Sequence, residues 1–173
     1  MTPSILIAGI GNIFHRDDAF GVAVAAKLSR SCPAENVRVV DFGIRGFDLV
    51  LALLDGYDLT ILVDAVQRGG TPGTLYAIEP DLDVIGDTPE SDPCTNAHGL
   101  DPLNVLATAR SAGANLGRVI VLGCEPAELD DESGRIGLSE QVEAAVDPAI
   151  EMIRSLIAKE RFQGSLYEER CVK

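Results

Sequence analysis

Positively charged residues are scarce in this sequence: 14 Lys and Arg stand against 27 Asp and Glu, for a formal net charge of −13. The acidic side chains recur from Asp17 to Glu169, so the balance does not come from one acidic tail. Such a charge disfavours binding to nucleic acid and to anionic membranes, and it favours solubility and cationic partners. We therefore expect neither a nucleic-acid partner nor a membrane partner.

Signals for export, membrane insertion and Cys-based zinc binding are also missing. The start, MTPSILIAGIGN, has no basic segment followed by a small-residue cleavage site. No apolar run approaches the roughly 20 residues that span a bilayer. The four cysteines form no CxxC pair and are typical of free thiols in a reducing compartment. The sequence thus predicts a cytoplasmic protein without a structural zinc site.

What is present is an alternation of apolar strand patterns with helical patterns. Strands are expected at 4–10, 37–42, 59–64, 74–79 and 118–124, and helices at 21–31, 46–55, 101–112 and 138–161. The fourth strand follows the third after a short turn, so we expect it to be antiparallel or at an edge. This order predicts an α/β three-layer sandwich, with a mostly parallel five-stranded twisted sheet and helices on both faces.

Single residues refine this outline. Asp101 and Ser139 are expected to cap the last two helices, and Pro148 is expected to kink or split the final one. We predict a single α/β domain over residues 1–162 and a loose C-terminal tail over 163–173.

The segment GIGNIFHRDDAFG, directly after the first strand, is a partial match to a dinucleotide-binding turn. Its first two glycines are present, but Phe14 stands where the third glycine would permit close packing beside a pyrophosphate. Asp17 and Asp18 at the start of the next helix would repel a phosphate. Asp41, at the end of the second strand, could hold a ribose, so a nucleotide-binding oxidoreductase stays an alternative.

Three metal-ligating side chains follow the expected strands. Asp18 comes just after the first strand, Asp64 ends the third, and His98 lies in the long loop before the next helix. Ligands of such sheets bind beyond the carboxyl ends of the strands. Two carboxylates and one imidazole can bind a divalent transition metal with positions left open. His15, the other histidine, is near the acidic pair, and we expect it to be a bystander.

Two further segments end strands. DFGIRG, which contains Asp41 and two glycines, predicts a tight turn that is either structural or an edge for docking a peptide beside the metal. Cys124, in GCEP, has no nearby His or Asn to activate it as a nucleophile, so we expect it to be a small buried residue.

Taken in order, these segments resemble the five signatures of the hydrogenase maturation proteases. These endopeptidases trim the C-terminus of the NiFe-hydrogenase large subunit. GIGNIFHRDDAFG resembles the first signature, DFGIRG the second, ILVDAV the third, the HGL loop the fourth and LGCEP the fifth. The similarity runs from about residue 5 to residue 157.

The resemblance implies that Asp18, Asp64 and His98 bind a metal, and that this metal is the nickel already inserted into the large-subunit precursor. A glutamate is common in the family where this chain has Asp18, so the shorter side chain must approach the metal more closely. The implied activity is removal of a C-terminal extension by an aspartic-type or metal-dependent endopeptidase. Asp18 and Asp64 would be catalytic, Asp41 would support them, and the protein would act as a monomer.

Two mechanisms stay open at this point. The metal could polarise the scissile carbonyl or lower the pKa of a bound water. Alternatively, it could only position the peptide while a carboxylate activates water as general base. Besides the oxidoreductase, a non-catalytic hydrogenase maturation chaperone is the other alternative, suggested by the acidic surface.

Overall fold

The computed structural model describes residues 2–31, 34–85, 101–129 and 135–171, with side chains described up to residue 162. The elements in chain order are β1 (Ile5–Ile10), a 3-10 helix η1 (Arg16–Ala19), α1 (Phe20–Ser29), β2 (Val37–Gly43), α2 (Gly46–Leu53), β3 (Leu59–Ala65), β4 (Leu75–Ile78), α3 (Pro102–Ser111), β5 (Arg118–Cys124) and α4 (Glu140–Cys171).

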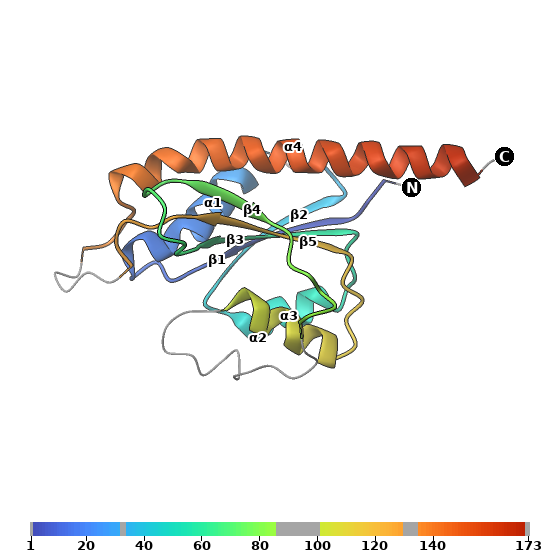
Figure 1. Ribbon diagram of the computed structural model, residues 1–173, viewed down its shortest axis with the longest axis horizontal. Helices are drawn as coiled ribbons and strands as arrows, with labels where there is room; N and C mark the ends of the chain where they lie inside the picture. Colours follow the sequence, from blue (N-terminus) through green and yellow to red (C-terminus); the bar gives the residue numbers. More distant parts are fainter. Residues whose placement is uncertain (1, 32–33, 86–100, 130–134, 172–173) are drawn as a thin grey trace.

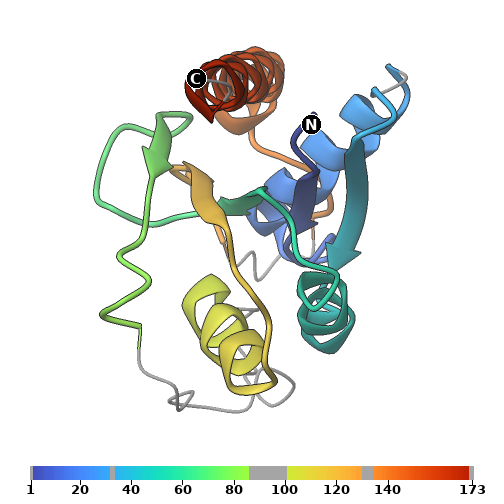
Figure 2. The same ribbon diagram turned by 90° about the vertical axis from the view of Figure 1, so that its right-hand side faces the viewer.

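The five strands form one sheet in the order β2-β1-β3-β5-β4. The first four strands in this order are mutually parallel, and β4 pairs antiparallel with β5 at the edge, as the short turn before it predicted. Helices α1 and α4 cover one face of the sheet, and α2 and α3 cover the other (Figures 1 and 2). The predicted three-layer α/β sandwich is therefore confirmed.

Strand β1 shows why a continuous apolar run forms the centre of such a sheet. All six of its residues are buried. Ile5 and Ile7 pack into the cluster beneath α1 and α4, whereas Leu6 and Ile10 pack into the cluster above α2 and α3. Because successive strand residues point to opposite faces, a strand with helices on both sides has no solvated position.

Helix α4 differs from its predicted form in two respects. It continues past Pro148 as one helix instead of splitting there. Its backbone is helical to Cys171, so the helix extends beyond its predicted end at residue 161. Within the described part of the chain, no helix is long and apolar enough to cross a membrane.

Two glycines let β1 and α1 approach each other closely. A Cβ atom on Gly21 would lie 2.0 Å from the carbonyl oxygen of Val63 and 2.3 Å from that of Ile10. A Cβ on Gly9 would lie 2.3 Å from the carbonyl oxygen of Gly21. These contacts are with backbone atoms, which cannot move aside as a flexible side chain would. The start of α1 is thereby held against the strand ends that carry the acidic residues.

We expect Gly21→Ala to destabilise the protein by about 1–3 kcal/mol or more, the range found for overpacked cores. Urea unfolding followed by circular dichroism measures the change. Ala26→Ser, on an exposed position of the same helix, is the matched control and should stay within about 0.5 kcal/mol of the wild type. A Gly21→Ala variant as stable as this control would contradict the close packing.

Candidate active site

The glycine turn after β1 presents Asp18. Gly11 has φ +129°, and a Cβ atom there would lie 1.7 Å from the backbone oxygen of Asp18, so only glycine allows η1 to lie against the turn. The backbone N–H of Asn12 donates to Asp18 Oδ2 at 2.6 Å, and the N–H of Asp18 donates to the carbonyl of His15 at 3.0 Å. The half-buried Asp18 carboxylate is therefore positioned by the backbone of the turn itself.

Asp64 stands near the end of β3 and is only 7% exposed. Its Oδ1 accepts a hydrogen bond from the N–H of Ala65 at 2.9 Å. Burial raises the pKa of Asp64 well above its ordinary value, and the negative charges of Asp18 and Asp101 raise it further. The structure thus brings Asp18 and Asp64 together at the carboxyl edge of the sheet, as the strand pattern predicted.

Asp101 is a third acidic residue whose charge acts on Asp64. Its carboxylate accepts the N–H of Leu103 at 2.9 Å, which makes it the predicted N-cap of α3, with Pro102 at the start of the helix. The sequence indicated this capping role but not the electrostatic effect on Asp64. That effect arises because α3 begins beside the end of β3 only in the folded chain.

A cluster of carboxylates, one of them buried, can bind a cation. The charged form of Asp64 is disfavoured by desolvation and by like charge, and a divalent ion between the carboxylates would reverse both effects. The oxygen donors of Asp18 and Asp64 therefore fit a metal. His98, the third predicted ligand, lies outside the described residues. Among the residues that are described, no group of three His, Cys, Asp or Glu side chains is arranged to hold a metal.

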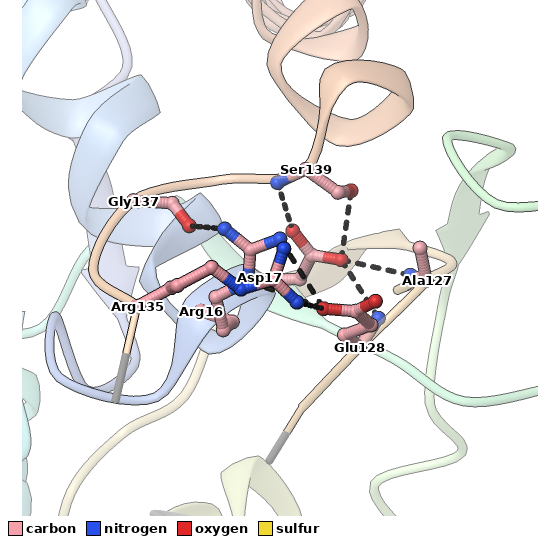
Figure 3. A network of polar contacts seen from close by, with 7 residues as sticks. All are labelled: Arg16, Asp17, Ala127, Glu128, Arg135, Gly137 and Ser139. Carbon is pink, nitrogen blue, oxygen red and sulfur yellow. Dashed lines mark hydrogen bonds and ion pairs between the residues drawn. The ribbon is translucent and has the colours of Figure 1, made fainter. Parts of the chain in front are cut away.

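Asp17, the other acid of the pair, points toward Ser139 and the backbone of Ala127 and Glu128 (Figure 3). It is fully buried. Its Oδ2 accepts the N–H groups of Ala127 and Glu128 at 2.8 and 2.9 Å and the hydroxyl of Ser139 at 2.9 Å. Its Oδ1 accepts the N–H of Ser139 at 2.6 Å. The two adjacent aspartates thus have different tasks, which the sequence did not separate.

The hydrogen bonds decide the charge state of Asp17. Burial by itself raises the pKa of this carboxyl, but the donors of Ser139, Glu128 and Ala127 together lower it below its ordinary value. The charged carboxylate ties η1 to the chain on both sides of residues 130–134. Ser139 directly precedes α4, as predicted for a cap, but its hydroxyl donates to Asp17.

Arg16 completes this attachment beside Asp17 (Figure 3). Its backbone has φ +48°, a left-handed conformation that is uncommon outside glycine. Its guanidinium donates to the carbonyl of Gly137 at 3.2 Å and pairs with Glu128, also at 3.2 Å, and Arg135 pairs with the same carboxylate. These contacts hold the backbone turn from which Asp17 and Asp18 project toward different partners.

Glu125, directly after β5, organises the loop that follows Asp64. Its buried carboxylate accepts the N–H groups of Arg68 and Gly69, at 2.9 and 3.0 Å, and the hydroxyl of Tyr76 at 2.8 Å. Burial raises the pKa of Glu125, but the tyrosine hydroxyl and the N–H donors outweigh it, so the pKa lies below its ordinary value. The sequence signal for this role is an acid placed immediately after a buried strand, within LGCEP.

Two further sequence candidates, Asp41 and Cys124, also follow or end strands of the sheet. Asp41 is exposed at the end of β2, where it pairs in register with Gly9, and its carbonyl accepts the guanidinium of Arg45. It therefore borders the edge, although it is not among the charges that shift Asp64. Cys124 is buried, and burial followed by the charges of Asp17 and Glu125 raises the pKa of its thiol to about 12. This agrees with a packing role and not with a nucleophile.

The fold and the site together define a small α/β protein with an acidic, cation-compatible site at the carboxyl edge of its sheet. The family model described as hydrogenase maturation protease matches residues 22–156. A protein of Methanocaldococcus jannaschii assigned to the hydrogenase maturation proteases is 35% identical over 156 residues, which cover 90% of this chain and 97% of that protein. The hydrogenase expression/formation protein HupD of Rhodobacter capsulatus is 34% identical, over 87% of this chain and 71% of that protein.

Solved structures agree with the sequence relatives. The hydrogenase maturating endopeptidase HybD from E. coli superposes with a TM-score of 0.70 and 25% identity, over 90% of this chain and 93% of that chain. The hydrogenase 2 maturation peptidase from a Thaumarchaeota archaeon gives a TM-score of 0.68 and 29% identity, over 90% and 98%. This chain belongs to the hydrogenase maturation protease family, and the predicted resemblance is confirmed. Membership makes it a peptidase and favours that class over the nucleotide-binding oxidoreductase.

Proposed function

We propose that this protein removes a C-terminal extension from the large-subunit precursor of a NiFe-hydrogenase after nickel has been inserted, acting in the cytoplasm as a monomer. The observation that carries the proposal is the pairing of Asp18 with the buried Asp64 at the carboxyl edge. Within a family of hydrogenase maturation proteases, a cation-compatible site suggests that the peptidase recognises a metal of its substrate.

Each residue has a role in this proposal. Asp18 and Asp64, together with His98, bind the precursor's nickel and so place the peptide bond that follows at the edge of the sheet. The nickel, which belongs to the substrate, supplies charge that favours the ionised form of Asp64. Asp41, at the neighbouring strand end, lines the approach to this edge. Nucleophilic attack by Cys124 is disfavoured by its buried thiol and raised pKa.

The two chemical routes make different demands on these groups. In one, the metal polarises the scissile carbonyl. In the other, the metal only positions the peptide and an ionised aspartate accepts a proton from the attacking water. The second route requires an ionised aspartate, and the nearby nickel favours that form. Rates measured across pH with nickel-saturated precursor would separate the routes.

The experiment that tests the function compares two forms of the purified precursor, one loaded with nickel and one without. Mass spectrometry should show a shortened product only for the nickel-loaded form. Cleavage of both forms alike would remove nickel recognition from the proposal. Binding of the nickel-loaded precursor with no change in its mass would support the non-catalytic chaperone instead.

A further inference from the structure

Large apolar side chains that face solvent gather on two loops at the carboxyl edge and on one side of α2. We call them the α2 apolar surface, and they are 42–68% exposed: Ile13, Phe14, Ile44, Phe47, Leu51 and Leu54. Exposed apolar residues scattered singly need no explanation, but a group of this kind on connected segments marks an interaction site.

Helix α2 is apolar on both of its sides. Phe47, Leu51 and Leu54 follow the spacing i, i+4, i+7, which places them along one face of a helix and its C-terminal end. The opposite face packs into the core through Leu49 and Leu53. A helix with this pattern is normally covered on both sides. Among the described residues, the sheet and α3 pack against one side of α2 and leave the side of Phe47 and Leu51 exposed (Figures 1 and 2).

Helix α2 itself carries little net charge, in a chain of net charge −13. The single charged residue within α2 is Asp48, and it forms an ion pair with Arg45 at 3.1 Å. A partner that docks here therefore needs no opposite charge, and an apolar patch is its best complement.

The α2 apolar surface is continuous with the catalytic edge. The N–H of Gly11 donates to the carbonyl of Gly43 at 3.1 Å, which joins the glycine turn to the loop before α2. Ile13 and Phe14 continue from that turn, and Ile44 directly follows Gly43. The same turn holds Asp18 through the N–H of Asn12. A molecule bound at Asp18 is therefore adjacent to this surface.

We propose that the α2 apolar surface docks an apolar patch on the folded body of the hydrogenase large-subunit precursor, while the precursor's metal-bearing C-terminal segment lies at Asp18 and Asp64. This inference rests on the proposed function and adds the surface that selects the substrate. Docking through an apolar face supplies affinity by burying apolar surface. It also brings the body of the substrate to the same side of the protein as the cut.

The test compares the double variant Phe47→Ser/Leu51→Ser with Phe162→Ser, whose phenylalanine is 67% exposed on α4 and lies off this surface. Affinity for the immobilised nickel-loaded precursor is measured by surface plasmon resonance, and processing is measured by mass spectrometry. The double variant should lose about tenfold or more in affinity, as expected for central interface residues. Its KM should rise with kcat nearly unchanged, since docking affects binding and not the chemical step. The control should match the wild type in both.

The outcomes separate this proposal from the proposed function. If wild-type protein cuts the precursor and the double variant binds and cuts it equally well, the docking surface is wrong and the function stands. If the wild-type protein binds the precursor without cutting it, the proposed function is wrong. The affinities of wild type and double variant then still show whether the α2 apolar surface binds the precursor. Light scattering measures whether the wild type is a dimer and the double variant a monomer. If so, and if the variant binds the precursor as well as wild type does, the surface contacts a second copy of this chain and the proposal is overturned. If the circular dichroism spectrum shows that the double variant does not fold, the same measurements are made on Ile44→Ser, which changes the loop and leaves the helix intact.

Discussion

Replacing Asp64 by asparagine is expected to abolish processing of the nickel-loaded precursor, with a rate at least about 10³-fold below wild type, the scale seen when a catalytic group is removed. Asparagine keeps the shape of the side chain but cannot carry the negative charge that binds a cation or accepts a proton. We expect the same loss for His98→Ala, whereas His15→Ala should process the precursor at nearly the wild-type rate.

The stability of Asp64→Asn distinguishes a lost site from a lost fold. Because the pKa of Asp64 is raised in the folded protein, its ionised form destabilises the fold at neutral pH, and this cost disappears as pH falls below the ordinary value of 3.8. A neutral asparagine removes the cost, so the variant should unfold at the same temperature as wild type or higher at pH 7. A variant that is inactive and also clearly less stable would argue against a direct role in the reaction.

Replacing Asp17 by alanine is expected to give the largest loss of stability, at least about 3 kcal/mol, since hydrogen bonds to a charged group contribute about 1.5–3 kcal/mol each. Four donors would lose their acceptor, two of them buried, and η1 would lose its side-chain attachment to Ser139 and to the backbone of residues 127 and 128 through Asp17. Urea unfolding measures the change. Asp147→Ala, which removes an exposed ion pair with Lys27, should cost no more than about 1 kcal/mol.

The pH dependence of Asp17 has the opposite sign to that of Asp64. The pKa of Asp17 is lowered by folding, so its stabilisation is present above the ordinary value of 3.8 and is lost as pH falls through the folded pKa. The difference in stability between wild type and Asp17→Ala should therefore shrink in acid. A difference that stays constant from neutral pH to well below 3.8 would show that the carboxylate charge is not what holds the network.

Much of the fold could be predicted because its local signals and its packing agree. The apolar run of β1 and the Pro102 start of α3 were recognisable in the sequence, and both elements form there. The far end of α4 was not predicted, since residues beyond 162 lack the apolar stripe on which the helix assignment rested. Of the two effects expected of Pro148, splitting of α4 does not occur, because one lost backbone hydrogen bond can be outweighed by the packing of buried neighbours such as Val146 and Ile150.

The sequence by itself determined that Asp18 and Asp64 would meet, because parallel strands end at one edge of the sheet and each residue follows such a strand. It did not determine which of the adjacent acids would face that edge. Successive residues of a 3-10 helix point about 120° apart, so either aspartate could have faced inward. The choice depends on donors at residues 127, 128 and 139, which lie at least 110 positions further along the chain. Only the tertiary structure brings those donors to Asp17, and it thereby leaves Asp18 for the site.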